Sequence, residues 1–127
     1  MLLELLDNNI DREPYEVDGS PFERVVQFVD DNIKNNISLD QMAAVARMSP
    51  RSLYNLFERH ACGTPKNYVR QRKLEHIHGL LSDPERKVRS ITEVALDYGF
   101  LHLGRFADNY RNTFGELPSD TLRKRVI

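Results

Sequence analysis

Residues 65–82 read PKNYVRQRKLEHIHGLLS, and this stretch decides the fold. Pro65 suits the first position of a helix, where its missing N–H costs nothing. Pro84 ends the helix, because a residue before proline is pushed out of the α region. At about 1.5 Å per residue, the helix is about 25 Å long. Its apolar residues fall within one arc and should be buried. They are Val69, Leu74, Ile77, Leu80 and Leu81.

Serine residues mark the predicted starts of the helices on either side of this stretch. They are Ser20, Ser38, Ser49 and Ser90. Three of them are followed three residues later by Glu or Gln, the pattern of a capping box, and Ser49 is followed by a proline at the first helical position. Gly63 and Gly115 are predicted to stop the helices that precede Pro65 and Pro118. A short last helix begins at Pro118.

The two sides of residues 65–82 contain the same unit. Each holds a short helix, a tight turn and a second short helix that is polar on its free face, which is the helix-turn-helix pattern. The repeat is visible in register, and a duplicated unit is a stronger signal than either motif alone. The pairs Leu53/Phe106, Phe57/Tyr110 and Pro65/Pro118 are 53 residues apart, and the pair Ala43/Ala95 is 52 apart. The residues predicted to face inward on the second helices are Leu53, Leu56, Phe57 and Ala61, and Leu103, Phe106, Ala107, Tyr110 and Phe114.

No strand pattern is present, so the sequence predicts an all-α fold of about seven helices. We expect two helix-turn-helix subdomains joined by a long linker helix. The predicted boundaries are residues 1–19 for an N-terminal tail or linker remnant, 20–64 for the first subdomain, 65–82 for the linker helix and 83–127 for the second subdomain.

The chain of 127 residues has a net charge of −1, but the charge is unevenly distributed. Residues 1–40 carry ten acidic and three basic side chains, and residues 41–127 carry nine acidic and fifteen basic ones. The basic part predicts an anionic partner, with an ordinary solvated surface as the alternative. A single cysteine excludes an internal disulfide, which suits a reducing cytoplasm. No apolar run can span a bilayer and no basic signal-peptide region is present, so a cytoplasmic location is expected.

These residues resemble the DNA-binding module of the AraC/XylS family of bacterial transcription regulators. The resemblance covers about residues 20–126 and rests on many positions at fixed spacing. In the first unit they are Ala43, Met48-Ser49-Pro50-Arg51, Leu53, Phe57, Gly63-Thr64-Pro65, Tyr68, Leu74 and Leu80-Leu81. In the second they are Ile91, Ala95, Gly99-Phe100, Phe106, Tyr110, Phe114-Gly115 and Pro118. GFLHLGRFADNY followed by FGELPSDTLRKR resembles the XylS-like subgroup, which includes activators of aromatic-acid degradation.

The resemblance implies a monomeric module that places two recognition helices in successive major grooves of a promoter with two boxes. It also implies regulation of transcription, with activation favoured over repression, and contact with RNA polymerase at target promoters. Many members carry a separate effector and dimerisation domain, for which the roughly twenty residues before the first helix are too few. The chain is therefore expected to be a stand-alone member or a fragment, and a dimer only if a separate domain is missing. No cofactor or metal is expected.

Three positions depart from the family pattern. Leu101 and Gly104 stand where serines are frequent near the start of the second recognition helix, and Thr121 stands where an aromatic is frequent. The expected helix cap is missing, and Gly104 lowers the local helix propensity. The second unit is therefore expected to bind less specifically, or to fray more, than the first.

The outward side of each second helix carries side chains suited to reading base edges. Arg51 can bind guanine O6 and N7, and Asn55 can pair with an adenine edge. Arg105 and Asp108 are the analogous pair in the second unit. The predicted base-reading residues are Arg51, Ser52, Tyr54, Asn55, Glu58, His102, Arg105, Asp108 and Asn109. The weaker candidates for phosphate contact are Lys66, Arg70, Arg72, Lys73 and Arg111.

Two other classes of function compete with DNA binding. An enzyme is not expected, because Ser, His and Asp occur without a nucleophile elbow or metal motif. His60, Cys62, His76 and His78 are conceivable zinc ligands, but His76 and His78 are two residues apart and point to different sides of a helix. The real competitor is a helical protein-interaction module whose basic face meets an acidic protein. Salt-dependent binding to duplex DNA with a site preference separates the two.

Overall fold

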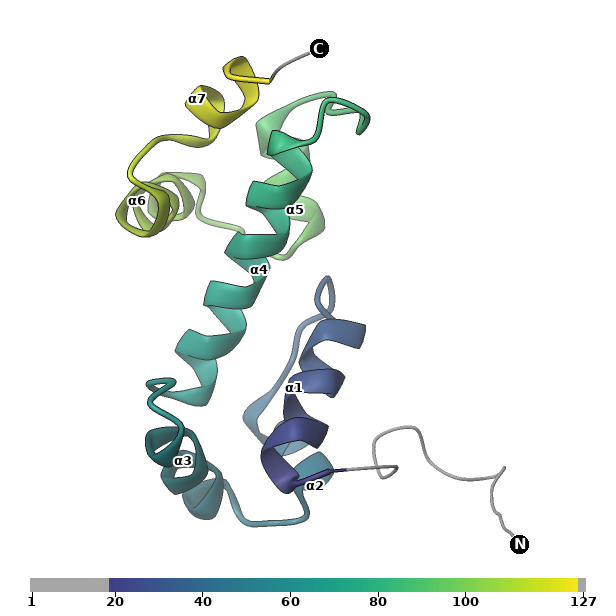
Figure 1. Ribbon diagram of the computed structural model, residues 1–127, viewed down its shortest axis with the longest axis vertical. Helices are drawn as coiled ribbons and strands as arrows, with labels where there is room; N and C mark the ends of the chain where they lie inside the picture. Colours follow the sequence, from purple (N-terminus) through teal and green to yellow (C-terminus); the bar gives the residue numbers. More distant parts are fainter. Residues whose placement is uncertain (1–18, 126–127) are drawn as a thin grey trace, which may run out of the picture. The chain divides into compact units, whose positions relative to one another are not determined.

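The computed structural model describes residues 19–125, so the predictions for residues 1–18 and for the last two residues lie outside the described residues. Seven α-helices and no strands occur in this part of the chain (Figure 1). The prediction of an all-α fold with about seven helices is confirmed. The helices are α1 (Pro21–Asp31), α2 (Leu39–Ala46), α3 (Pro50–Arg59), α4 (Pro65–Ser82), α5 (Ile91–Asp97), α6 (Leu103–Phe114) and α7 (Pro118–Arg123).

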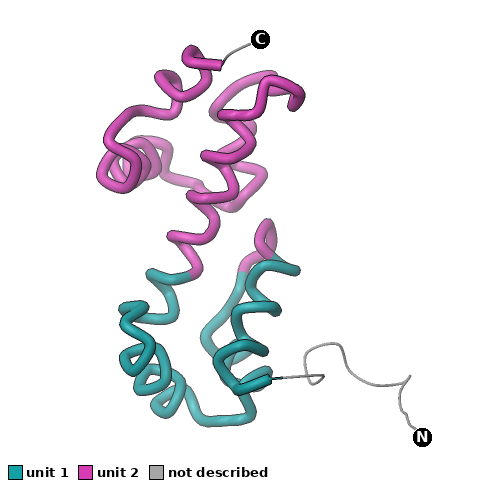
Figure 2. Tube along the Cα trace, in the orientation of Figure 1, with its two compact units in different colours: residues 1–32, 37–68 teal, residues 33–36, 69–127 magenta. Residues whose placement is uncertain are grey.

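The described chain divides into two compact units, and the division falls within α4 (Figure 2). Unit 1 consists of residues 19–32 and 37–68, and unit 2 consists of residues 33–36 and 69–125. In unit 1, α1 packs against α2 and α2 packs against α3. In unit 2, α5 packs against α6 and α6 packs against α7. The first turn of α4 therefore belongs to unit 1 and the remainder to unit 2. The predicted subdomain boundaries stay a prediction.

The core of unit 1 forms where helical spacing brings apolar residues to one side of each helix. Phe22 of α1 packs edge-on against Phe57 of α3, with the ring centroids 5.3 Å apart. Phe57 packs in the same way against Tyr68 in the first turn of α4, at 5.4 Å. These aromatic contacts connect α1, α3 and the start of α4. The other buried apolar residues of unit 1 include Val25, Val29, Met42, Ala43, Ala46, Leu53 and Leu56.

Unit 2 buries one side of α4 against the helices that follow it. Val69, Leu74, Ile77 and Leu81 are buried and Leu80 is half-buried, so the predicted apolar side of α4 is confirmed. The buried residues that follow α4 include Ala95, Tyr98, Phe106 and Tyr110. The rings of His76 and His78 of α4 lie 6.5 Å from Tyr98 and 6.0 Å from Tyr110.

The internal repeat is reflected in burial. Each pair of equivalent residues is buried at both positions, so the two units use the same sequence positions for their cores. The buried pairs are Leu53/Phe106, Phe57/Tyr110, Pro65/Pro118 and Ala43/Ala95.

Capping hydrogen bonds fix three helix starts as predicted. The side chains of Ser20 and Ser38 each accept a hydrogen bond from the N–H three residues later, and the side chains of Glu23 and Gln41 accept one from the serine N–H. Ser49 Oγ accepts from the third N–H of α3 at 3.1 Å. These bonds satisfy amide groups that have no partner within the helix.

The predicted capping box at Ser90 is only half formed. Ser90 Oγ accepts a hydrogen bond from the N–H of Glu93 at 3.0 Å, but among residues 19–125 the Ser90 N–H donates no bond to the Glu93 carboxylate. That carboxylate instead lies 3.9 Å from Nε of Arg89. A basic neighbour outside the helix competes for the acidic group, which the serine-to-glutamate spacing alone does not reveal.

Two apolar residues predicted to face inward are exposed. α3 ends at Arg59, and Ala61 follows in a left-handed conformation with φ 56°, so it has left the helix. Gly63 therefore lies beyond the helix end rather than stopping α3. Leu103 is 38% exposed, because it is the first residue of α6 and lines an apolar surface groove beside Pro118.

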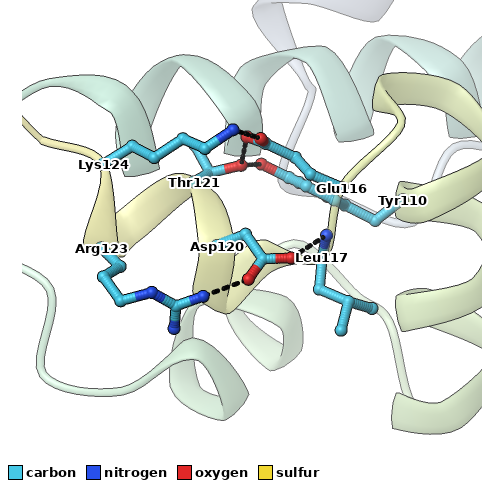
Figure 3. Close-up of polar contacts among 7 residues, drawn as sticks. All are labelled: Tyr110, Glu116, Leu117, Asp120, Thr121, Arg123 and Lys124. Carbon is cyan, nitrogen blue, oxygen red and sulfur yellow. Dashed lines mark hydrogen bonds and ion pairs between the residues drawn. The ribbon is translucent and has the colours of Figure 1, made fainter.

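A chain of hydrogen bonds connects α6 to α7 (Figure 3). The buried Tyr110 hydroxyl donates to Thr121 Oγ1 at 2.7 Å, and Thr121 donates to Glu116, whose carboxylate pairs with Lys124. Burial raises the pKa of Tyr110, and the hydrogen bonds from Lys124 and Thr121 lower the pKa of Glu116. Thr121, which replaces an expected aromatic, therefore holds the last helix through a buried polar contact.

Arg125 connects the end of the described chain to α4. Its guanidinium donates hydrogen bonds to the carbonyl oxygens of Leu81 at 2.8 Å, Leu80 at 2.9 Å and Arg86 at 2.9 Å. The carbonyls of Leu80 and Leu81 lie in the last turn of α4, where carbonyl groups have no partner within the helix. One side chain thus caps α4 and fixes the segment after α7.

Arg125→Ala is expected to lower the free energy of unfolding by about 1–3 kcal/mol, since hydrogen bonds from a charged donor are the stronger class. The matched control is Arg123→Ala. The Arg123 side chain is 71% exposed and pairs with Asp120 on the surface, so its loss should cost less than about 1 kcal/mol. Urea unfolding followed by circular dichroism measures both variants. Equal losses would contradict the role given to Arg125.

Candidate nucleic-acid interface

The turns of the two helix-turn-helix pairs have the same backbone geometry. In the α2–α3 turn, Arg47 has φ 60°, and the N–H after it bonds to the carbonyl of Ala43 at 3.0 Å. In the α5–α6 turn, Gly99 has φ 91°, and the N–H after it bonds to the carbonyl of Ala95 at 2.9 Å. The two turns are therefore structural counterparts, with a left-handed residue at the same place in each.

Counted from the left-handed residue to the N-cap of the next helix, the second turn is one residue longer than the first: Arg47 to Ser49 in unit 1, and Gly99 to His102 in unit 2. α3 begins at Pro50 with Ser49 as its N-cap, and α6 begins at Leu103 with His102 as its N-cap. The turns correspond at an offset of 52 residues, whereas the helices after them correspond at 53. The additional residue in unit 2 is Leu101, and its side chain is 77% exposed. The change of offset from 52 to 53 is the sequence signal for this additional residue. The comparison with the family pattern marks Leu101 only as a departure from a frequent serine.

α3 directs its polar side chains away from the core of unit 1. Arg51 and Asn55 lie one turn apart on one face of the helix. The hydroxyl of Ser52 lies 3.1 Å from Ser49 Oγ, so it already takes part in the helix cap. The exposed residues include all five predicted base readers of this helix, Arg51, Ser52, Tyr54, Asn55 and Glu58.

α6 presents a similar but less regular outer face. His102, Arg105 and Asp108 are exposed, as expected for base readers, but Asn109 is half-buried. The N-cap side chain of His102 makes no capping hydrogen bond, so the missing cap expected from the sequence is confirmed. An added Cβ at Gly104 would meet no atom within 4 Å, which shows that the outer side of α6 is open at this point.

The candidate base readers are available to an external partner. Within residues 19–125, no hydrogen bond or ion pair engages the side chains of Arg51, Asn55, Arg105 or Asp108. Binding a ligand at these four side chains would break no hydrogen bond or ion pair within residues 19–125. Their contacts with bases stay a prediction.

The five cations predicted to contact phosphate differ in their surroundings. Lys66, Arg70 and Arg111 are exposed, and no partner in the described part of the chain engages their side chains. Arg72 is half-buried and pairs with Glu75.

Lys73 has a role within unit 2. Its ammonium donates to the carbonyl oxygens of Ile33 at 2.5 Å and Asn35 at 2.8 Å, which lie in the loop after α1. Burial lowers the pKa of Lys73. The ammonium already binds two carbonyls, and the contact of Lys73 with a phosphate stays a prediction.

The histidines weighed as zinc ligands have packing roles. His60 stacks on Phe22 with ring centroids 3.8 Å apart, and His78 stacks on Phe114 at 4.3 Å. Among the described residues, no group of three His, Cys, Asp or Glu side chains could hold a metal ion. A search of the same residues finds no helix with the length and apolar character needed to cross a membrane.

The sequence matches a family model described as a helix-turn-helix domain over residues 42–124. It is 66% identical over 123 residues to the XylDLEGF operon transcriptional activator of Pseudomonas putida, an alignment that covers 97% of this chain and 38% of that relative. It is 63% identical over 122 residues to the XylDLEGF operon transcriptional activator 2 of the same species, covering 95% of this chain and 77% of the relative. The chain thus spans only 38% of the length of the first of these relatives.

Solved structures share the fold. A probable AraC family transcriptional regulator from Rhodopseudomonas palustris has a TM-score of 0.73 and 35% identity, over 80% of this chain and 94% of that one. The DNA-binding domain of AdpA in complex with a target DNA has a TM-score of 0.71 and 21% identity, over 83% of this chain and 92% of that one. Together with the sequence matches, these results show that the chain belongs to the AraC/XylS family of transcriptional regulators, in its XylS-like subgroup.

Proposed function

We propose that this chain binds double-stranded DNA sequence-specifically through two helix-turn-helix units and thereby activates bacterial transcription. The observation that carries the proposal is the duplicated turn, followed in each unit by a helix with an exposed polar face. On these faces, Arg51, Asn55, Arg105 and Asp108 have no hydrogen bond or ion pair among residues 19–125. α3 and α6 are then the recognition helices, each placed in a major groove.

In unit 1, the proposed readers are arranged for two base pairs along one groove. Arg51 can donate two hydrogen bonds to guanine O6 and N7, and Asn55, one turn later, can pair with an adenine edge. Tyr54 is suited to a thymine methyl or a phosphate, and Glu58 to a cytosine amino group. Exposed cations with no internal partner, such as Lys66, would contact phosphates and so fix the position of the protein along the duplex. These contacts would not distinguish one base sequence from another.

In unit 2, Arg105 and Asp108 are the proposed counterparts of the unit 1 readers. They lie three residues apart and therefore on neighbouring positions of one helix face. Asn109 contributes less, because it is half-buried. Arg70 and Arg111 are the proposed phosphate contacts of this unit.

The activating role rests on the relatives, whose names describe operon transcriptional activators. Activation implies contact with RNA polymerase at a promoter, and a transcriptional role places the protein with the chromosome in the bacterial cytoplasm. Two reading units in one chain allow a monomer to occupy both boxes of the site.

The competing function is a basic surface that binds an acidic protein. Equilibrium binding of labelled duplexes at a series of salt concentrations separates the two. DNA binding predicts that affinity falls steeply with salt for every duplex, because counterions are released from phosphates, and that one sequence is preferred at each concentration. Weak binding without sequence preference at any salt concentration would favour the protein-interaction module.

Arg51→Ala is expected to weaken binding to the preferred site by about 1–3 kcal/mol and to relax the preference at one position. Arg59→Ala is the matched control, since Arg59 is an exposed arginine in the last turn of the same helix. It should affect preferred and random duplexes to the same extent. Gel shifts on both DNAs measure the two variants. An equal loss on both DNAs for Arg51→Ala would reassign this residue to phosphate contact.

The box read by unit 2 is expected to contribute less to discrimination than the box read by unit 1. α3 has a serine cap and a proline at its first position, whereas α6 has no side-chain cap and carries Gly104 in its first turn. The box of unit 1 is the one at which Arg51→Ala relaxes preference. Scrambling each box separately and measuring affinity tests the ranking, which a larger loss from the unit 2 box would reverse.

A further inference from the structure

Leu101 is an apolar side chain at the entrance of the second recognition helix. It is the most exposed of the large hydrophobic residues in the part of the chain that the structure describes. A single exposed leucine is ordinary on a protein surface, so exposure alone carries little weight. Its position is informative, because Leu101 is the residue by which the second turn exceeds the first and it has no counterpart in unit 1.

Leu101 lines a surface cavity of about 240 Å³ that lies entirely within unit 2. Phe100 and Phe106, with ring centroids 5.0 Å apart, give the cavity an apolar wall. Arg70 and Arg105 line the same cavity, and neither guanidinium has a hydrogen bond or ion pair among residues 19–125. Apolar surface and two unpaired cations therefore meet at one place.

A partner that carries negative charge and a small apolar group close together is complementary to this cavity. The major groove of DNA provides both, because phosphate oxygens border it and the C5 methyl of thymine projects into it. Resting on the proposed DNA-binding function, we infer that Leu101 is a specificity-determining residue that contacts the C5 methyl of a thymine in the box read by unit 2. Arg70 binds the adjoining phosphate.

This assignment gives the two units different recognition chemistry. Unit 1 has Ser49 at the start of its recognition helix, where the hydroxyl caps the helix. Unit 2 has no side-chain cap at the start of α6 and presents an apolar contact in front of that helix. A methyl contact distinguishes thymine from other bases by less than a bidentate hydrogen-bond pair does, which agrees with the lower discrimination expected of unit 2.

Deoxyuridine provides the test, because it pairs with adenine as thymidine does but lacks the C5 methyl group. Duplexes selected by the full chain from a random library are resynthesised with single deoxyuridine replacements in the unit 2 box. Fluorescence anisotropy should show that the unsubstituted protein loses about fourfold in affinity at one position, the effect of burying one methyl-sized group. Leu101→Ala should bind the thymidine and deoxyuridine duplexes equally at that position, and Leu101→Met should keep the difference.

Leu103→Ala is the matched control. Leu103 is also an exposed leucine at the start of α6, but it lines a different groove, together with Ile91 and Pro118. This variant should keep the fourfold preference for thymidine.

Three results would overturn the assignment: a selected unit 2 box without thymine, no deoxyuridine effect in the unsubstituted protein, or an unchanged effect in Leu101→Ala. Failure of the chain to enrich any duplex would overturn the proposed function instead, so the two failures are distinguishable.

Discussion

Burial of the apolar side of α4 is the constraint on which both units depend. A helix of 18 residues with this many polar side chains would be marginal in water by itself. Its stability comes from tertiary contacts, with each fully buried aliphatic side chain contributing about 1.5–3 kcal/mol. The half-buried Tyr68 adds its ring to the aromatic contacts of unit 1, while Leu74, Ile77 and Leu81 contribute buried side chains to the core of unit 2. Because one helix provides core residues to both units, neither unit is complete without it.

The helical period that builds the cores also determines which residues face the solvent. On α3, burying Leu53 and Phe57 leaves Arg51 and Asn55 on the exposed side. On α6, Phe106 and Tyr110 occupy the equivalent core positions and leave Arg105 exposed. The candidate DNA-binding surface therefore consists of the positions that the core does not use. Each unit has one such surface, because the sequence of unit 1 is repeated in unit 2.

Local signals explain why so much of the fold could be predicted from the sequence. Apolar periodicity predicted the helices, and the internal repeat predicted the two paired units. Ser20, Ser38 and Ser49 predicted three of the helix starts. The features that the sequence did not reveal depend on contacts or backbone choices that local patterns do not contain. The carbonyl partners of Lys73 lie 38 and 40 residues away in the sequence. Ala61 fits the helical spacing, but the chain leaves α3 before reaching it.

The candidate site was predictable to a similar degree and for the same reasons. Exposure of the α3 readers follows from periodicity, whereas Asn109 of α6 is half-buried and lines the surface cavity in unit 2. Leu101 was visible in the sequence as the point where the repeat offset changes from 52 to 53. The inference that Leu101 contacts DNA also depends on the helix start at Leu103 and on the two arginines that line the cavity. Only the structure provides these two observations.

Selection of binding sites from a random duplex library is the most direct test of DNA reading by two units. The stoichiometry of the selected complex is measured by analytical ultracentrifugation. Two short boxes about one helical turn apart, roughly 34 Å on straight B-DNA, occupied by a single chain, are the predicted result. Enrichment of a single box, or no enrichment at all, would contradict it.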